Sequence, residues 1–335
     1  MPRFVPFVPF VPSLGARRPP VAAVVLAVAS LVAASCGSGG TGRAASPTTG
    51  TETVQAGAAR PSSGCAHATR APRSGRHALT VAGRTRTYQL SVPPDRDPHR
   101  PAPLILLFHG FSGDGARIVA LTRLPARAAR TGAIVVAPDG TNHTWELGAR
   151  SADAAFVDAL VDSIAATTCV DLQRVYATGF SAGAAFTIIY SCARQDRIAA
   201  IATVAVDFQL GCHRPMPILA FHGTKDPAVP YDDGAVGASL PGVEVRGTEL
   251  NLRDWARLDG CRTTPDDHVM GSQVTRQTWP HCDAGTEVVL YRVDGGGHSW
   301  PGAPPGGGAG LTTEQIDASA LIVAFFAAHH LAAPR

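Results

Sequence analysis

Lysine is nearly absent from this sequence, and positive charge is nowhere clustered. Of 335 residues, 29 are basic and 26 are acidic, and Lys225 is the one lysine among them. A nucleic-acid-binding surface usually shows runs of basic residues interleaved with aromatic ones, whereas the arginines here are scattered and the net charge is only +3. We therefore expect no nucleic-acid partner.

Metal-site spacing and membrane-spanning runs are missing as well. The seven cysteines form no CxxC pair and lie outside histidine-rich tracts, so we expect no metal site. No apolar run reaches the roughly 20 residues that a spanning helix needs. With 45% hydrophobic residues the chain can still bury a large core, and its length suggests one large domain or two small ones.

Residues 1–36 have the features of an export signal. A VPF-VPF-VP run, which neither a helix nor an inner strand tolerates, precedes two arginines and the apolar stretch 21–34, which is too short to span a bilayer. The stretch ends in Ala-Ala-Ser-Cys, similar to a bacterial lipobox. We predict either a lipid on Cys36, which would tether the protein to a membrane, or cleavage near Ser35 and release.

Residues 37–63 are mostly Gly, Ser, Thr, Ala and Pro, a composition that predicts a flexible linker. Without Cys36, six cysteines remain and allow three disulfides in an oxidising compartment. The pair that is close in sequence, Cys261–Cys282, is the first one expected. For the other four cysteines we favour Cys169–Cys192 and Cys65–Cys212.

The rest of the chain, residues 64–335, shows the alternation of a single α/β domain. Short apolar runs predict buried strands, and apolar residues at three- and four-residue spacing predict helices between them. We expect strands at 84–92, 104–108, 134–137, 175–178, 198–206, 217–222 and 287–293, and helices at 116–130, 152–167, 182–194, 250–258 and 313–329. This alternation predicts a mostly parallel central sheet with helices on both faces.

A candidate nucleophile follows the strand expected at 175–178. The sequence Gly-Phe-Ser-Ala-Gly at 179–183 joins this strand to a helix, which is the context of a nucleophile elbow. The glycines permit a tight turn that holds Ser181 in a strained conformation at the positive end of the helix dipole. The alternative is that Ser181 merely caps the helix.

Candidate acids and a candidate base follow two later strands. Asp226 lies just beyond the strand expected at 217–222, where open α/β sheets place functional groups, and Asp207 is the second choice of acid. His222 is expected to be structural. Three glycines precede His298 and free the backbone to bring its ring toward Ser181, where a histidine supplies a general base near neutral pH.

The chain order Ser, Asp, His is that of an α/β-hydrolase. Acyl transfer in such a fold also needs donors for an oxyanion. The loop His109-Gly110-Phe111, after the strand at 104–108, lies where one backbone N–H is supplied. We expect the N–H groups of Phe111 and Ala182 to be the donors and the side chain of His109 to be structural.

The motifs GFSAG, HGTKDPAVPY and GGGHSWPG, with SSGC at 62–65, CVD at 169–171 and APDG at 137–140, together resemble the secreted polyhydroxybutyrate depolymerase and feruloyl esterase group of α/β-hydrolases. The resemblance covers about residues 62–335. It implies ester hydrolysis by a triad of Ser181, Asp226 and His298, with oxyanion donors at Phe111 and Ala182 and no cofactor.

Two departures from that group concern the substrate pocket. Residues 184–186 read Ala-Ala-Phe where relatives usually carry Gly and Met, which would narrow the pocket beside Ser181. Trp145 is followed by Glu where the group often has Asn. We predict that Trp145 and Trp300 either form an aromatic wall for an acyl or sugar group or simply pack in the interior.

These features together predict a secreted or lipid-anchored serine esterase. Its substrate would be a small or oligomeric ester: a hydroxybutyrate oligomer, or a feruloyl or acetyl ester of polysaccharide. The same triad also suits an acyltransferase or a peptidase, and a non-catalytic lipoprotein that binds glycans is a further alternative. The sequence leaves the acyl group, the alcohol and the oligomeric state open.

Overall fold

The protein is described from a computed structural model, which covers residues 59–67, 72–236, 244–304 and 307–331. The predicted export signal, which includes Cys36, and residues 37–58 of the expected linker lie outside these ranges. Within them, none of the helices has both the length and the apolar character needed to cross a membrane.

A 10-stranded sheet forms the centre of the domain, in the order β1-β2-β4-β3-β5-β6-β7-β12-β11-β10. The strands between β4 and β12 pair in parallel, and those at both edges pair antiparallel. The strands are β1 (Gly75–Val81), β2 (Arg84–Ser91), β3 (Ala102–Phe108), β4 (Ile134–Pro138), β5 (Val170–Phe180), β6 (Ala200–Val204), β7 (Ile218–Gly223), β10 (Asp266–Val269), β11 (Val274–Trp279) and β12 (Val288–Val293). A separate short ribbon pairs β8 (Gly234–Ala235) with β9 (Glu244–Val245).

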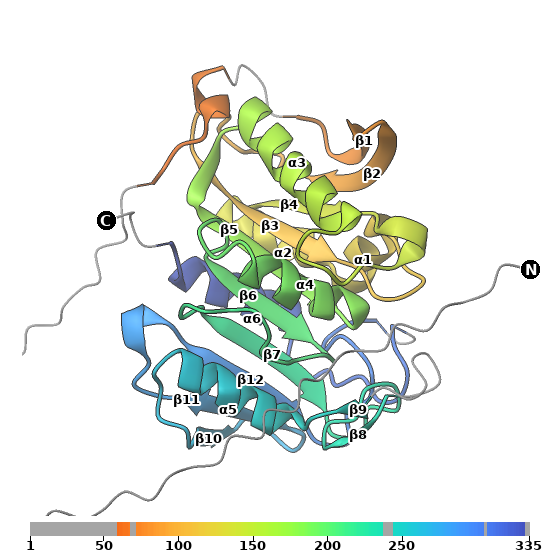
Figure 1. Cartoon of the computed structure of the whole chain (residues 1–335), viewed down its shortest axis with the longest axis vertical. Helices are drawn as coiled ribbons and strands as arrows, with labels where there is room; N and C mark the ends of the chain where they lie inside the picture. The colour runs from red at the N-terminus through yellow and green to blue at the C-terminus, as the bar shows by residue number, and fades with distance from the viewer. Residues whose placement is uncertain (1–58, 68–71, 237–243, 305–306, 332–335) are drawn as a thin grey trace, which may run out of the picture. The chain divides into compact units, whose positions relative to one another are not determined.

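Helices cover both faces of this sheet, which confirms the predicted α/β-hydrolase class. Figure 1 shows α3, α4 and α5 on the viewer's side of the strands. Alternate residues of β3 enter two different cores: Leu104 and Leu106 pack with α3, α4 and α5, and Ile105 and Leu107 pack with α1, α2 and α6. The helices are α1 (Gly115–Thr122), α2 (Leu124–Ala128), α3 (Ala152–Thr167), α4 (Ala182–Cys192), α5 (Thr248–Leu258) and α6 (Ala318–Ala328), and 3₁₀ turns lie at η1 (Ser63–Ala66), η2 (Ala129–Thr131), η3 (Thr141–His143) and η4 (Asp283–Gly285).

Local chemistry explains where the helices begin and break. Helix α3 has the predicted bounds, and its N-cap Ser151 accepts a hydrogen bond from the N–H of Ala154. The single helix expected at 116–130 is wrong, because Arg123 takes a left-handed conformation and Pro125 opens the first turn of α2. Helix α6 begins five residues later than expected, after the N-cap Asp317.

Three disulfides link Cys65–Cys169, Cys192–Cys212 and Cys261–Cys282. The prediction for the last pair is confirmed, and the pairings Cys169–Cys192 and Cys65–Cys212 are wrong. Cys192 ends α4, where the loop after β6 returns to it, and Cys169 lies beside the N-terminal segment 59–67.

That segment is held to the start of β5 by further contacts. The N–H of Ser62 donates to Val170 O at 2.8 Å, its hydroxyl donates to Thr168 O at 2.9 Å, and the N–H of Arg60 donates to Asp171 Oδ1 at 3.0 Å. Residues 60–63, which the composition places in the linker, therefore pack on the domain.

Candidate active site

The predicted strand–turn–helix around Ser181 is present. Ser181 joins β5 to α4 with φ 54° and ψ −120°, a strained combination for a residue with a side chain. A Cβ on Gly179 would lie 2.3 Å from the backbone carbon of Gly183, and one on Gly183 would lie 2.2 Å from Phe108 O. Only glycine fits at these two positions, so the motif's spacing is a steric requirement of this turn.

His298 follows β12 on a loop that its own backbone ties down. Its N–H donates to Ala309 O at 2.7 Å, and its carbonyl accepts from the N–H of Ala309 at 2.9 Å. The ring packs against Phe180, the residue before Ser181, with 4.9 Å between ring centres. The imidazole therefore lies beside the turn that carries Ser181.

Asp226 holds this imidazole. Its side chain is fully buried, and its Oδ2 lies 2.7 Å from His298 Nδ1. Its other oxygen accepts from the N–H groups of Ala228 and Val229, both at 2.8 Å. Asp207, the second choice of acid from the sequence, lies instead 2.8 Å from His222 Nδ1.

The loop expected to supply an oxyanion donor is positioned by His109. The N–H of Gly140 donates to His109 Nε2 at 3.0 Å, so the ring proton is on Nδ1, which donates to Gly110 O at 2.8 Å. Burial lowers the pKa of His109 although that hydrogen bond opposes it, which favours the neutral ring. These contacts fit the structural role expected for this side chain.

The two residues expected to supply oxyanion donors, Phe111 and Ala182, belong to segments next to Ser181. A Cβ built on Gly110 would be 3.6 Å from Ser181 Cβ, so the loop that carries Phe111 runs next to the nucleophile candidate. Among the residues that the structure describes, neither the N–H of Phe111 nor that of Ala182 has a backbone hydrogen-bond partner. Ala182 is the first residue of α4, and an unpaired N–H at a helix N-terminus can receive a negative oxygen.

The two tryptophans do not form a wall. Trp145 is 4% exposed and Trp300 1%, and they belong to the cores on opposite faces of the sheet. Trp145 Nε1 donates to His109 O at 2.8 Å, and its ring stacks on Phe186 with 4.5 Å between centres. Interior packing is therefore the role of both rings. Phe111, on the loop that runs next to the serine, is instead 66% exposed.

Asp139 and Asp153 support the loop beneath His109, a role that sequence reasoning missed. Asp139 belongs to the APDG motif and accepts hydrogen bonds from Gly115 N at 2.7 Å and Thr87 Oγ1 at 2.5 Å. Asp153 is wholly buried and accepts from Arg86 Nη2, and from Thr141 N and Glu146 N on the same loop. For Asp139, the available signal was its position directly after the buried strand β4.

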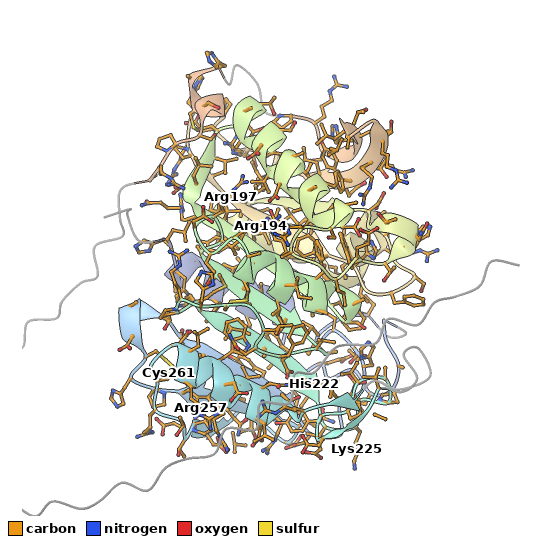
Figure 2. All side chains as sticks on the ribbon, viewed as in Figure 1. Arg194, Arg197, His222, Lys225, Arg257 and Cys261 are labelled. Atoms are coloured by element: carbon orange, nitrogen blue, oxygen red, sulfur yellow. A yellow bond between two sulfur atoms is a disulfide. The ribbon has the colours of Figure 1, made fainter. Side chains whose placement is uncertain are left out.

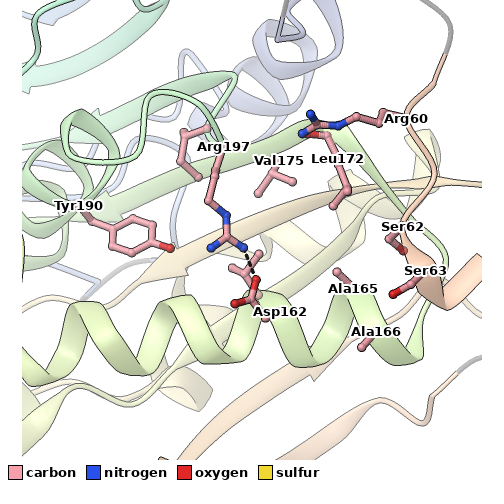
Figure 3. A pocket seen from close by; sticks show the side chains of 12 residues that line it. Arg60, Ser62, Ser63, Asp162, Ala165, Ala166, Leu172, Val175, Tyr190 and Arg197 are labelled. Atoms are coloured by element: carbon pink, nitrogen blue, oxygen red, sulfur yellow. Dashed lines mark hydrogen bonds and ion pairs between the residues drawn. The ribbon is translucent and has the colours of Figure 1, made fainter. Parts of the chain in front are cut away.

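A separate pocket of about 240 Å³ lies at the opposite ends of the strands, between the N-terminal segment, α3 and the start of β5. Figure 3 shows Arg197 reaching across it to Asp162, with Arg60 and Ser62 on the far side. It lies at the amino ends of the strands, and Ser181 lies at their carboxyl ends, so it is not part of the site described above. Within the described ranges, no group of three or more His, Cys, Asp or Glu side chains could hold a metal ion.

The chain is similar to known esterases. Residues 86–239 match the family described as esterase PHB depolymerase. Feruloyl esterase C of Emericella nidulans is 30% identical over 242 residues, which cover 68% of this chain and 81% of that enzyme. The chain belongs to the PHB depolymerase and feruloyl esterase group.

Other members of the group align more partially or less closely. Feruloyl esterase B of Piromyces equi is 31% identical over 59% of this chain, and the match spans only 40% of that longer protein. Feruloyl esterase D of Neurospora crassa is 28% identical over 74% of this chain and 86% of its own length. Like them, this group member is a carboxylic ester hydrolase.

Proposed function

We propose that the protein is an exported serine esterase that cleaves its substrate through an acyl-enzyme on Ser181. The contact of 2.7 Å between His298 Nδ1 and Asp226 Oδ2, made beside the strained turn of Ser181, carries this proposal. A carboxylate at Nδ1 keeps the ring proton there and leaves Nε2 free as a base.

The chemistry follows from that tautomer. His298 Nε2 takes the proton of Ser181 Oγ as the oxygen attacks the ester carbonyl. The N–H groups of Phe111 and Ala182 receive the negative oxygen, and such a donor typically lowers the barrier by about 2.7–4 kcal/mol. The protonated ring then gives its proton to the departing alcohol, and water repeats the sequence to release the acid.

The relatives and the site's surface support an ester of an aromatic or short hydroxy acid as substrate. Three of the relatives above are named feruloyl esterases. Phe111 is an exposed aromatic side chain on the loop that runs next to Ser181, and an apolar surface on that loop would suit a feruloyl group or a hydroxybutyrate unit. Three disulfides suit an oxidising, extracellular location, and a lipid on Cys36 would keep the enzyme at the cell surface.

The test is hydrolysis by the purified full chain of p-nitrophenyl acetate, p-nitrophenyl butyrate, methyl ferulate and 3-hydroxybutyrate oligomers. Ser181→Ala should abolish turnover of every ester that the parent cleaves. Ser163→Ala, a change of the same kind within helix α3, is the control and should retain activity. The preferred ester decides between the two substrate classes.

Other outcomes would redirect the assignment. Product transfer to an added sugar hydroxyl, with little free acid, would indicate an acyltransferase on the same triad. Folded protein that neither cleaves any ester nor reacts at Ser181 with a fluorophosphonate would refute the serine esterase and favour a binding protein.

A further inference from the structure

Besides His298, a buried histidine lies close to Asp226. It is His222, near the end of β7, whose side chain is 1% exposed (Figure 2). Its Nδ1 lies 2.8 Å from Asp207 Oδ2 and 2.9 Å from Thr248 Oγ1. Its Nε2 lies 3.0 Å from Val229 O and 3.6 Å from Asp226 Oδ2.

The partners of the ring determine where its protons are. Val229 O can only accept, so Nε2 of His222 must carry a proton. Nδ1 contacts both the carboxylate of Asp207 and the hydroxyl of Thr248. A carboxylate can only accept, so its contact of 2.8 Å requires a proton on Nδ1, toward which the Thr248 oxygen then also acts as an acceptor. The ring is therefore an imidazolium whose two N–H groups point toward Asp207 and toward the Val229 carbonyl next to Asp226.

The peptide group of Val229 connects this ring to the candidate triad. Its carbonyl accepts from His222, and its N–H donates to Asp226 Oδ1. Two imidazole rings thus lie near Asp226 Oδ2: His298 Nδ1 is 2.7 Å away and His222 Nε2 is 3.6 Å away.

We propose that His222 is a positioning residue for the reaction: held as a cation between Asp207 and Asp226, it offsets the charge of Asp226 and limits how strongly His298 retains a proton. The inference rests on the proposed function only in assigning His298 as the base. Behind His298, the base, the charges of Asp226, His222 and Asp207 then alternate.

The surroundings favour the charged ring. Burial lowers the pKa of His222, but the hydrogen bond and charge of Asp207, helped by Val229 and Asp226, outweigh burial and raise it above its ordinary value. The amide of Asn251 fixes Asp207 from α5, donating to its backbone oxygen at 2.6 Å.

Other ionisable groups around the ring are already paired. Tyr231 packs edge-on against His222 with 5.7 Å between ring centres, and its hydroxyl donates to Glu249 Oε1 at 3.0 Å. Burial, together with Glu249, raises the pKa of Tyr231, so its ring stays neutral. Arg292, opposite His222 on β12, lies 3.0 Å from Asp294 and 3.8 Å from Glu249.

Loss of the positive charge on His222 should shift the pH dependence of kcat/KM in one direction. Without the positive charge of His222, the carboxylate of Asp226 acts undiminished on His298 and stabilises its protonated form. Because His298 must be neutral to accept the serine proton, the acid limb of the kcat/KM profile moves to higher pH. Removing one unit charge near Asp226, in this partly buried site, is expected to move that limb by about one pH unit.

His222→Gln is the direct variant, because a glutamine amide can still donate toward Val229 O but carries no charge. We expect its acid limb for p-nitrophenyl acetate to lie about one pH unit higher than that of the parent. Asp207→Asn removes the partner that keeps the ring charged, and we expect a smaller shift in the same direction.

His329→Asn is the matched control, since His329 is a buried histidine at the end of α6 whose Nδ1 lies 2.8 Å from Phe325 O. Its profile should keep the parent's acid limb. A purely structural role for His222 would lower kcat/KM equally at every pH and leave the limb in place. That outcome, in both His222→Gln and Asp207→Asn, overturns the proposal.

A second measurement needs neither activity nor a folded His222 variant. In Ser181→Ala protein with ¹⁵N-labelled histidine, long-range ¹H–¹⁵N spectra should show one ring with both nitrogens protonated at about pH 8, where an ordinary histidine is neutral. Absence of such a ring overturns the inference even if the esterase is active. Its presence in a chain that cleaves no ester supports the charged ring and counts only against the proposed function.

Discussion

The two oxygens of Asp226 have different partners, and this difference sets the orientation of His298. Two backbone N–H groups, from Ala228 and Val229, already point at Oδ1, so only Oδ2 is available to the imidazole. The carboxylate therefore does more than supply charge: it fixes which ring nitrogen carries the proton.

Asp226→Asn should reverse that tautomer. The backbone donors require an oxygen at the Oδ1 position, so the new NH₂ group would face His298 Nδ1 and force the ring proton onto Nε2. We expect kcat to fall by about 10³–10⁴-fold, as for the loss of a triad carboxylate, measured on p-nitrophenyl acetate. Asp207→Asn should lose far less. If Asp207→Asn proved the more damaging change, the acid would be Asp207.

The buried carboxyl of Asp259 should make the free energy of unfolding depend on pH. Burial raises the pKa of this carboxyl to about 7, against the hydrogen bond from Met216 N–H, while an unfolded aspartate titrates near 3.9. The folded state thus binds more protons between about pH 4 and 7, and the free energy of unfolding falls as pH rises through that window.

Asp259→Asn cannot ionise, so it should lack this decline. Urea unfolding at about pH 5 and pH 8 should show the variant gaining on the parent by on the order of 1–3 kcal/mol at the higher pH. A constant difference between the two proteins at both pH values would mean that Asp259 is ionised throughout.

At the scale of elements, β3, β5 and α4 meet so closely at the nucleophile turn that their backbones touch. A Cβ on Gly183 would lie 2.2 Å from Phe108 O, at the end of β3, and 2.5 Å from His109 O, in the loop expected to supply an oxyanion donor. Gly183→Ala should therefore displace that loop. We expect a loss of about 1–3 kcal/mol in stability and at least about a tenfold loss in kcat/KM, since oxyanion donors act only when correctly placed.

Gly148→Ala is the control for that change. The nearest atom to its Cβ would be Ser151 Cβ at 3.7 Å, an ordinary contact. Its unfolding free energy should stay within about 0.5 kcal/mol of the parent. Equal behaviour of the two alanine variants would contradict the close packing described here.

Elements buried on both faces could be predicted from the sequence, and those at the sheet edges could not. The apolar runs of β3, β4 and β7 predict strands in the interior of the sheet. Strand β10 is exposed along its whole length and reads Asp-Asp-His-Val, so no hydrophobic pattern marks it. Its partner β11 carries polar side chains on both faces, so no hydrophobic alternation marks its bounds.

Residue types at the site were predictable because the chemistry prescribes them, but interior pairings were not. Ser181, Asp226 and His298 each follow a strand at the expected edge of the sheet. The contact between Asp207 and His222 depends on how the loop after β6 passes the end of β7 and on the packing of α5, which no spacing in the sequence encodes. The roles of Trp145 and Trp300 likewise depend on which side of the sheet each ring faces.

For the whole molecule, the disulfides differ in the length of chain that they close. Cys65–Cys169 spans 104 residues, and Cys192–Cys212 and Cys261–Cys282 span 20 and 21. The first one also joins the N-terminal segment, and with it the predicted tether, to the central strand β5.

Closure of a longer loop removes more entropy from the unfolded chain, so the cost of losing each bond should differ. The chain-entropy relation gives about 4.7 kcal/mol for a loop of about 100 residues and roughly 3 kcal/mol for one of about 20. The double variant Cys65→Ser/Cys169→Ser should therefore lose more unfolding free energy than Cys192→Ser/Cys212→Ser, measured by denaturant titration. Peptide mapping without reductant checks that the remaining pairs are unchanged. If the variants ranked in the reverse order, the N-terminal segment would be held by its hydrogen bonds to β5 rather than by the cross-link.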